Sequence, residues 1–160
     1  MTRQLGILFL ATILSWYGMM AIHEAGHCAA AWLTGGAVEK VQLPVWGFSQ
    51  TFYRENPHPL AVAWAGALGG VAVAALLLGA ARFARDSIRH GLLYFAGFSL
   101  IANGLYMGLG GFDRVGDCAE LLIHGARLWQ LVAFGIGTVG LGVYSWHRMG
   151  PIRGWFRRVT

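Results

Sequence analysis

The stretch LGILFLATILSWYGMMAIHEAGH, Leu5–His27, decides the fold because it joins an uncharged run of 18 residues to the pattern HEAGH. A run of about 20 apolar residues is long enough for a helix to cross the hydrocarbon core of a bilayer. Ionisable groups at that depth are costly, so two histidines and a glutamate within five residues point to a function. We therefore expect a transmembrane helix that carries a site near its far end.

The spacing within HEAGH favours metal binding. His23 and His27 are four residues apart, so on a helix both imidazoles project from one face and can bind one ion. Glu24 lies beside that ion, where a carboxylate can take a proton from a metal-bound water. A catalytic zinc usually has three protein ligands and one open position, so a third ligand must come from elsewhere. The alternative is that the histidines are hydrogen-bonded structural residues.

The composition indicates a membrane protein. Hydrophobic residues make up 56% of the 160 residues and charged residues only 12%, with a mean hydropathy of +0.54, whereas about a quarter of the residues of a soluble protein are charged. The uncharged runs are Leu5–Ile22, Leu60–Ala81, Gly91–Phe112 and Leu128–Trp146. We predict a mainly α, polytopic membrane helical bundle in a single domain, residues 1–160, with spans at about 5–33, 60–81, 91–112 and 128–146. The first run exceeds the length of a signal-peptide core, so we expect it to be retained.

Two segments between the spans carry turn or strand signals. In residues 37–58, Val41, Leu43 and Val45 alternate with Gln42 and Pro44, which predicts a short β-hairpin after the first helix. Pro44 cannot donate a backbone hydrogen bond, so we place it at an edge or a bulge. The glycine-rich stretch from Gly108 to Asp117 is predicted to break the third helix. Within the second span, Gly66-Ala67-Leu68-Gly69-Gly70 has a spacing of small residues that lets helices approach closely, so we assign these glycines to packing.

The net charge of +5 lies mostly in short segments that flank the apolar runs, which indicates contact with a lipid bilayer and no nucleic-acid partner. Arg153, Trp155 and Arg157 belong to an expected interfacial tail. Eight arginines fall on the side of the termini: Arg3, Arg82, Arg85, Arg89, Arg148, Arg153, Arg157 and Arg158. The side with HEAGH has four basic residues: Lys40, Arg54, Arg114 and Arg127. The positive-inside rule then predicts both termini in the cytoplasm.

Topology narrows the search for the third ligand. If each run crosses once, the ends of the first and third spans emerge on the same face, which brings Asp113 and Asp117 to the side of HEAGH. Asp117 is preferred because a helix is predicted to start there, whereas Asp113 neighbours Arg114 and suits a surface ion pair. The weaker candidates are Glu120 and His124, and the cysteines Cys28 and Cys118 are interpreted as small apolar filler.

HEAGH on the first helix, a second span rich in glycine, and Asn103 followed by a glycine-rich turn with Asp117 resemble the site-2 protease family of intramembrane zinc metalloproteases. The resemblance implies one Zn²⁺ held by His23, His27 and Asp117. In this family the aspartate usually sits in an Asn-x-x-Pro…Asp-Gly motif; here the proline is absent and the interval is longer.

The same resemblance implies hydrolysis of peptide bonds in or near the transmembrane segments of a membrane protein substrate, with Glu24 as the catalytic base. Asn103 would bind the substrate backbone or the oxyanion; the alternative is an interhelical hydrogen bond. We expect a multi-pass protein of a prokaryotic plasma membrane. Site-2 proteases usually have the site nearer the cytosol, opposite to the orientation that the arginines favour. The competing classes are a non-proteolytic membrane zinc-binding protein and a structural membrane adaptor.

Overall fold

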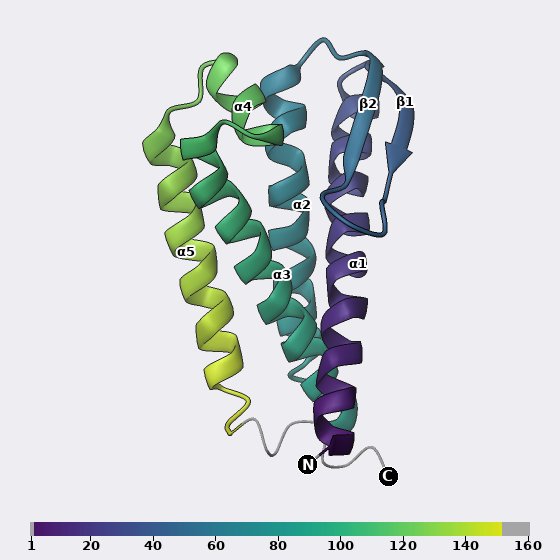
Figure 1. The fold of residues 1–160 in the computed structure, drawn as a ribbon, viewed down its shortest axis with the longest axis vertical. Coiled ribbons are helices and arrows are strands. Elements are labelled where there is room, and N and C mark those ends of the chain that lie inside the picture. Colours follow the sequence, from purple (N-terminus) through teal and green to yellow (C-terminus); the bar gives the residue numbers. More distant parts are fainter. Residues whose placement is uncertain (1, 152–160) are drawn as a thin grey trace.

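The computed structural model describes residues 2–151, and the expected interfacial tail around Arg153–Arg158 lies outside this range. Four long helices, one short helix and a hairpin follow one another along the chain (Figure 1). The elements are α1 (Thr2–Leu33), β1 (Ala37–Gln42), β2 (Gln50–Glu55), α2 (Pro59–Ala80), α3 (Asp86–Asp113), α4 (Gly116–Ile123) and α5 (Leu128–His147). The predicted bundle and the hairpin after the first helix are both confirmed.

Within residues 2–151, the four long helices are each long and apolar enough to cross a membrane. Large apolar side chains cover the outer surface; Leu76 is 72% exposed and Ile136 is 71% exposed, which suits contact with lipid tails. A helix satisfies all of its backbone hydrogen bonds within its own segment, as the hydrocarbon interior requires. Helix α1 begins and α5 ends at one end of the bundle, while α4 lies at the other (Figure 1).

Small residues let the helices approach closely, as the glycine spacing of the second span predicts. Gly69 on α2 lies so near α1 that a Cβ added to it would come within 3.3 Å of the Gly26 Cα. Between α3 and α5, a Cβ added to Gly108 would come within 3.3 Å of the Gly135 Cα. At the α4 end, Met107, Leu121 and Leu131 form a buried cluster that fixes α4 against α3 and α5.

The third helix differs from its predicted span at both ends. It begins at Asp86 and runs through the glycines at 108, 110 and 111 to Asp113, so these glycines do not break it. They serve close packing instead, because a side chain at Gly111 would meet Leu128 and Leu131 of the α5 region. The break comes at Arg114, which adopts a left-handed conformation with a φ of 52°.

The hairpin is shorter than its sequence pattern. Strands β1 and β2 pair antiparallel, with Val41 opposite Thr51, and β1 ends at Gln42, before Pro44. The loop between them turns toward α1, where the Tyr17 hydroxyl donates a hydrogen bond of 2.9 Å to the Val45 carbonyl. The hairpin therefore lies along the half of α1 that carries HEAGH (Figure 1).

Candidate metal centre

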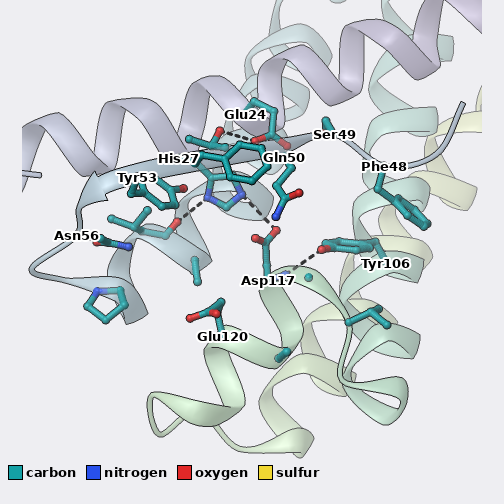
Figure 2. Close-up of a pocket in the computed structure, with 18 residues that line it drawn as sticks. Glu24, His27, Phe48, Ser49, Gln50, Tyr53, Asn56, Tyr106, Asp117 and Glu120 are labelled. Atoms are coloured by element: carbon teal, nitrogen blue, oxygen red, sulfur yellow. Dashed lines mark hydrogen bonds and ion pairs between the residues drawn. The ribbon is translucent and has the colours of Figure 1, made fainter. Parts of the chain in front are cut away.

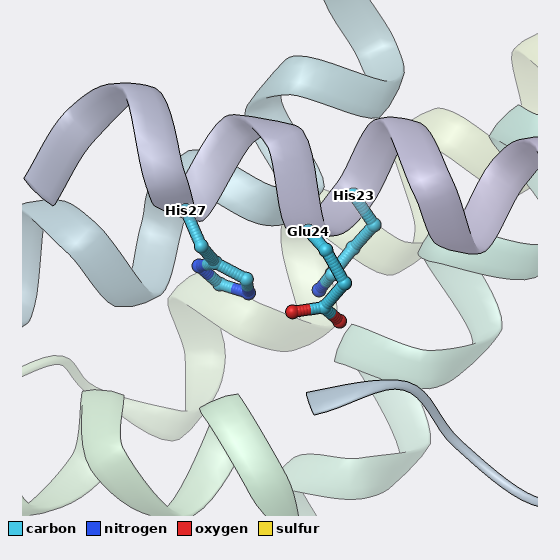
Figure 3. Close-up of side chains that lie close together, drawn as sticks. All are labelled: His23, Glu24 and His27. Atoms are coloured by element: carbon cyan, nitrogen blue, oxygen red, sulfur yellow. The ribbon is translucent and has the colours of Figure 1, made fainter. Parts of the chain in front are cut away.

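Helix α1 directs three ionisable side chains toward one side. His23, Glu24 and His27 are all buried, and their ligand atoms lie within 4.8 Å of one another. Figure 3 shows the two imidazoles and the carboxylate leaving the helix in the same direction. The helical spacing therefore produces the shared face that the sequence predicts, at a depth where unpaired charges are costly.

Asp117, in the first turn of α4, reaches both imidazoles. Its Oδ2 atom lies 2.8 Å from the His23 Nε2 atom and 3.2 Å from the His27 Nε2 atom. Asp113 ends α3 with an exposed side chain and has no such contact with the histidines. Of the two candidate aspartates, the fold thus brings Asp117 to the paired histidines.

The opposite ring nitrogens are held by acceptors. The His23 Nδ1 atom lies 2.9 Å from the Asn103 Oδ1 atom, and the His27 Nδ1 atom lies 2.7 Å from the Val62 carbonyl oxygen. A neutral imidazole in either place therefore carries its proton on Nδ1 and donates it, which leaves the Nε2 lone pair free for an ion. The two Nε2 atoms and the Asp117 carboxylate oxygen then face one another, and a shared cation stabilises that arrangement, whether it is a metal ion or a proton held on an Nε2 atom.

The electrostatic surroundings of Asp117 favour its charged form. Burial raises the pKa of this carboxyl, but the hydrogen bonds to His23 and His27 outweigh burial and leave the pKa well below its usual range. The Asp117 carboxyl is therefore ionised at neutral pH. An ionised carboxylate oxygen is an accepted protein ligand for a divalent cation such as zinc.

Asn103 is buried on α3 and contacts the His23 ring. It is 1% exposed, its Oδ1 atom faces His23, and its Nδ2 atom donates to the Ser99 carbonyl oxygen at 2.9 Å. Its polar atoms are thus already used, and it is absent from the lining of the adjacent cavity. The alternative of an interhelical hydrogen bond describes its place, and this bond orients the His23 ring.

Two glycines on α2 leave room for the side chains of the centre, which the sequence pattern alone did not reveal. A Cβ added to Gly66 would collide with the Nε2 atoms of His23 and His27, and one added to Gly70 would meet the Asn103 amide. Sequence reasoning assigned these glycines to helix packing only. Gly66 and Gly70 are four residues apart, as are His23 and His27. This matching spacing is the sequence signal that could have shown that the two helix faces meet.

Tyr106 holds the start of α4, and it was also missed. Its hydroxyl oxygen accepts a hydrogen bond of 3.0 Å from the Asp117 backbone N–H, and its ring packs edge-on against His23 at 5.8 Å between centroids. Gly116 has a φ of 49°, and a side chain there would collide with the Tyr106 hydroxyl. Tyr106 lies three residues after Asn103, on the same helical face, so a search at that spacing would have found it.

The remaining candidates lie at the edge of the centre. Glu120 pairs with His124 at 3.4 Å on the exposed side of α4. Cys28 and Cys118 are buried and do not pair with each other. Burial, and then the charge of Asp117, raise the pKa of Cys118 to about 12, so it stays a neutral thiol and a poor metal ligand.

A cavity of about 660 Å³ opens beside the centre. Figure 2 shows β2 on one side of it and α4, with Asp117 and Glu120, on the other. Glu24 and His27 border this space, as does Tyr53 of β2. Two of the three candidate ligands, His27 and Asp117, therefore border a volume large enough for a stretch of polypeptide.

Comparison with known proteins gives one result. A family model described as Peptidase M50B-like matches residues 6–109, a range that includes His23, Glu24, His27 and Asn103 and ends before Asp117. No curated protein and no solved structure matches the chain.

The position of Gly66 generates a prediction. Gly66→Ala should lower the stoichiometry of bound metal severalfold, because its methyl group would collide with both Nε2 atoms. Gly79→Ala on the same helix is the matched control, since nothing lies within 4 Å of a Cβ there. Elemental analysis of the purified variants measures the effect. Full metal content in Gly66→Ala would show that the ion does not sit at this place.

The two aspartates give a second prediction. Asp117→Asn should weaken metal affinity by about 100-fold, because the amide oxygen carries no charge and its NH₂ group can face the imidazoles. Asp113→Asn should leave affinity unchanged, since Asp113 is exposed and remote from the histidines. Competition with a chromogenic chelator compares the two proteins. A larger loss in Asp113→Asn would reverse the assignment.

Proposed function

Because the chain belongs to the Peptidase M50B-like family of intramembrane metallopeptidases, we propose that it is a zinc-dependent protease that hydrolyses peptide bonds in or near the transmembrane segments of membrane proteins. The observation that carries the proposal is the convergence of His23, His27 and Asp117 beside a buried glutamate. The four helices that are long and apolar enough to cross a membrane support a multi-pass membrane protein.

The donor set fits zinc. Two imidazole nitrogens and one carboxylate oxygen are a known catalytic combination, and they leave a fourth position for water. Donor atoms about 2.0 Å from a tetrahedral ion are ~3.3 Å apart. The 2.8 and 3.2 Å between Asp117 and the two histidines approach this separation, so only a small adjustment would admit the ion.

When bound, zinc lowers the pKa of a coordinated water to about 7 and polarises the carbonyl of a substrate. Glu24 is the base: its carboxylate accepts the proton of the attacking water and passes it to the departing amine. Glu24 is 4% exposed, and one of its carboxylate oxygens lies within 4.8 Å of a ring nitrogen of each histidine, within reach of this transfer. A protein that only stores zinc has no use for such a base.

The hairpin supports a way to hold the substrate. A helical substrate hides its peptide bonds, so it must unwind into an extended form before attack. Strand β2 borders the cavity and pairs with β1 along one edge, which leaves its other edge for main-chain hydrogen bonds to an extended polypeptide. Burial raises the pKa of Tyr53 above its usual value, with the charges of Asp117 and Glu24 adding to the effect, so its phenol stays protonated beside that polypeptide.

Glu24→Gln should retain zinc and lose proteolysis by a factor on the order of 10² to 10⁴, the usual contribution of a general base. His23→Ala should lose both zinc and proteolysis, because it removes a ligand. Cleavage of fluorescently labelled casein in detergent, with elemental analysis of the same samples, separates the two effects. Wild-type cleavage by Glu24→Gln would exclude it as the base.

Proline on β2 tests the role of its free edge. The backbone N–H groups of successive residues in a strand point to opposite edges. One of the two variants Phe52→Pro and Tyr53→Pro therefore removes an N–H donor that faces away from β1. That variant should keep its zinc and cleave casein at least several times more slowly. If both variants retain zinc and the wild-type rate, the strand does not hold the substrate.

A further inference from the structure

Thr51 links the hairpin to the buried glutamate. Its side chain, in the second position of β2, is 8% exposed, and its hydroxyl donates a hydrogen bond of 2.5 Å to the Glu24 Oε2 atom. Within residues 2–151, this is the one hydrogen bond that the Glu24 carboxylate receives. A residue 27 positions along the chain, on another element, therefore holds the carboxylate.

The bond occupies one carboxylate oxygen and leaves the other for chemistry. A glutamate side chain has three rotatable bonds, and its terminal torsion is broad without a partner. A donor fixed on Oε2 removes that freedom, so Oε1 is the oxygen left for a proton. The Glu24 carboxylate lies close to the paired imidazoles (Figure 3).

A threonine at position 51 favours a role beyond packing. Apolar and β-branched side chains pack well on the inner face of a strand, so valine would suffice there for packing alone. The Thr51 hydroxyl instead donates to a carboxylate, and hydrogen bonds to charged groups are the stronger kind. Thr51 and Phe52, adjacent on β2, both border the cavity.

We propose that Thr51 is a positioning residue that orients the Glu24 carboxylate. The strand expected to bind the substrate then also holds the catalytic base in its working orientation. This inference rests on the proposed proteolytic function for its meaning. It adds a coupling: Glu24 is aligned only while β2 lies against α1. An extended polypeptide that pairs with β2 would steady that strand and, with it, the carboxylate.

The test compares Thr51→Val, which keeps the shape and removes the hydroxyl, with Thr51→Ser, which keeps the hydroxyl. Each full-length variant is loaded with Co²⁺ in detergent and titrated with acetohydroxamate. This chelator binds the metal through two oxygens and shares a proton with a neighbouring carboxylate, so its affinity reports the position of Glu24. The zinc forms are assayed in parallel for casein cleavage, with kcat and KM measured separately.

Thr51→Val should bind acetohydroxamate about tenfold more weakly and show a kcat reduced about 10- to 100-fold, with KM and metal stoichiometry unchanged. Thr51→Ser should stay within about threefold of the wild type in both measurements, because it can still donate to Glu24. The split between kcat and KM, and the rescue by serine, separate positioning from packing.

Three results would overturn the inference: wild-type acetohydroxamate affinity in Thr51→Val, an equal loss in Thr51→Ser, or loss of Co²⁺ from Thr51→Val. The first denies any link to Glu24, the second assigns Thr51 to packing, and the third assigns it to support of the ligands. If the zinc-loaded wild type cleaves no casein but the acetohydroxamate series keeps the expected order, the proposed proteolysis fails while the positioning role stands.

Discussion

The structure depends on an electrostatic constraint: two imidazole lone pairs and a carboxylate oxygen face one another between apolar helices. Each imidazole donates its other nitrogen's proton to a fixed acceptor, one on α3 and one on α2. This fixes the tautomer of each neutral imidazole, so a cation shared by the three donor atoms, a metal ion or a proton, stabilises them together. Several features of the surrounding helices serve this need, including the missing side chain of Gly66 and the hydroxyl of Tyr106.

In the proposed mechanism, the hairpin carries both the edge that binds the substrate and the residue that holds the catalytic base. Its second strand borders the cavity, offers a free edge for an extended chain, and holds the buried glutamate through Thr51. In an apolar environment, an unwound polypeptide must find partners for its backbone N–H and C=O groups. A strand edge supplies those partners without demanding a particular sequence, and the proposed metal centre lies beside the same cavity.

The sequence was sufficient to predict those parts of the site that depend on local spacing or on the number of membrane spans. HEAGH beside an uncharged run predicted a face with two histidines, and counting spans brought Asp117 to the same side. It was insufficient to predict contacts that depend on how helices far apart in the sequence are aligned with one another. The contact between Asn103 and His23 was not predicted, and Gly66 was interpreted as packing only. The strand ended at Gln42 because Pro44 cannot donate to a ladder and the loop bonds to Tyr17 instead.

The most direct test of the metal centre is zinc K-edge X-ray absorption on the purified, zinc-loaded protein. The account predicts a four-coordinate shell of nitrogen and oxygen at about 2.0–2.2 Å, with the multiple-scattering signature of two imidazoles and no sulfur. A zinc–sulfur distance near 2.3 Å would place Cys28 or Cys118 in the shell and contradict the assignment of Asp117. A shell without imidazole would contradict the centre itself.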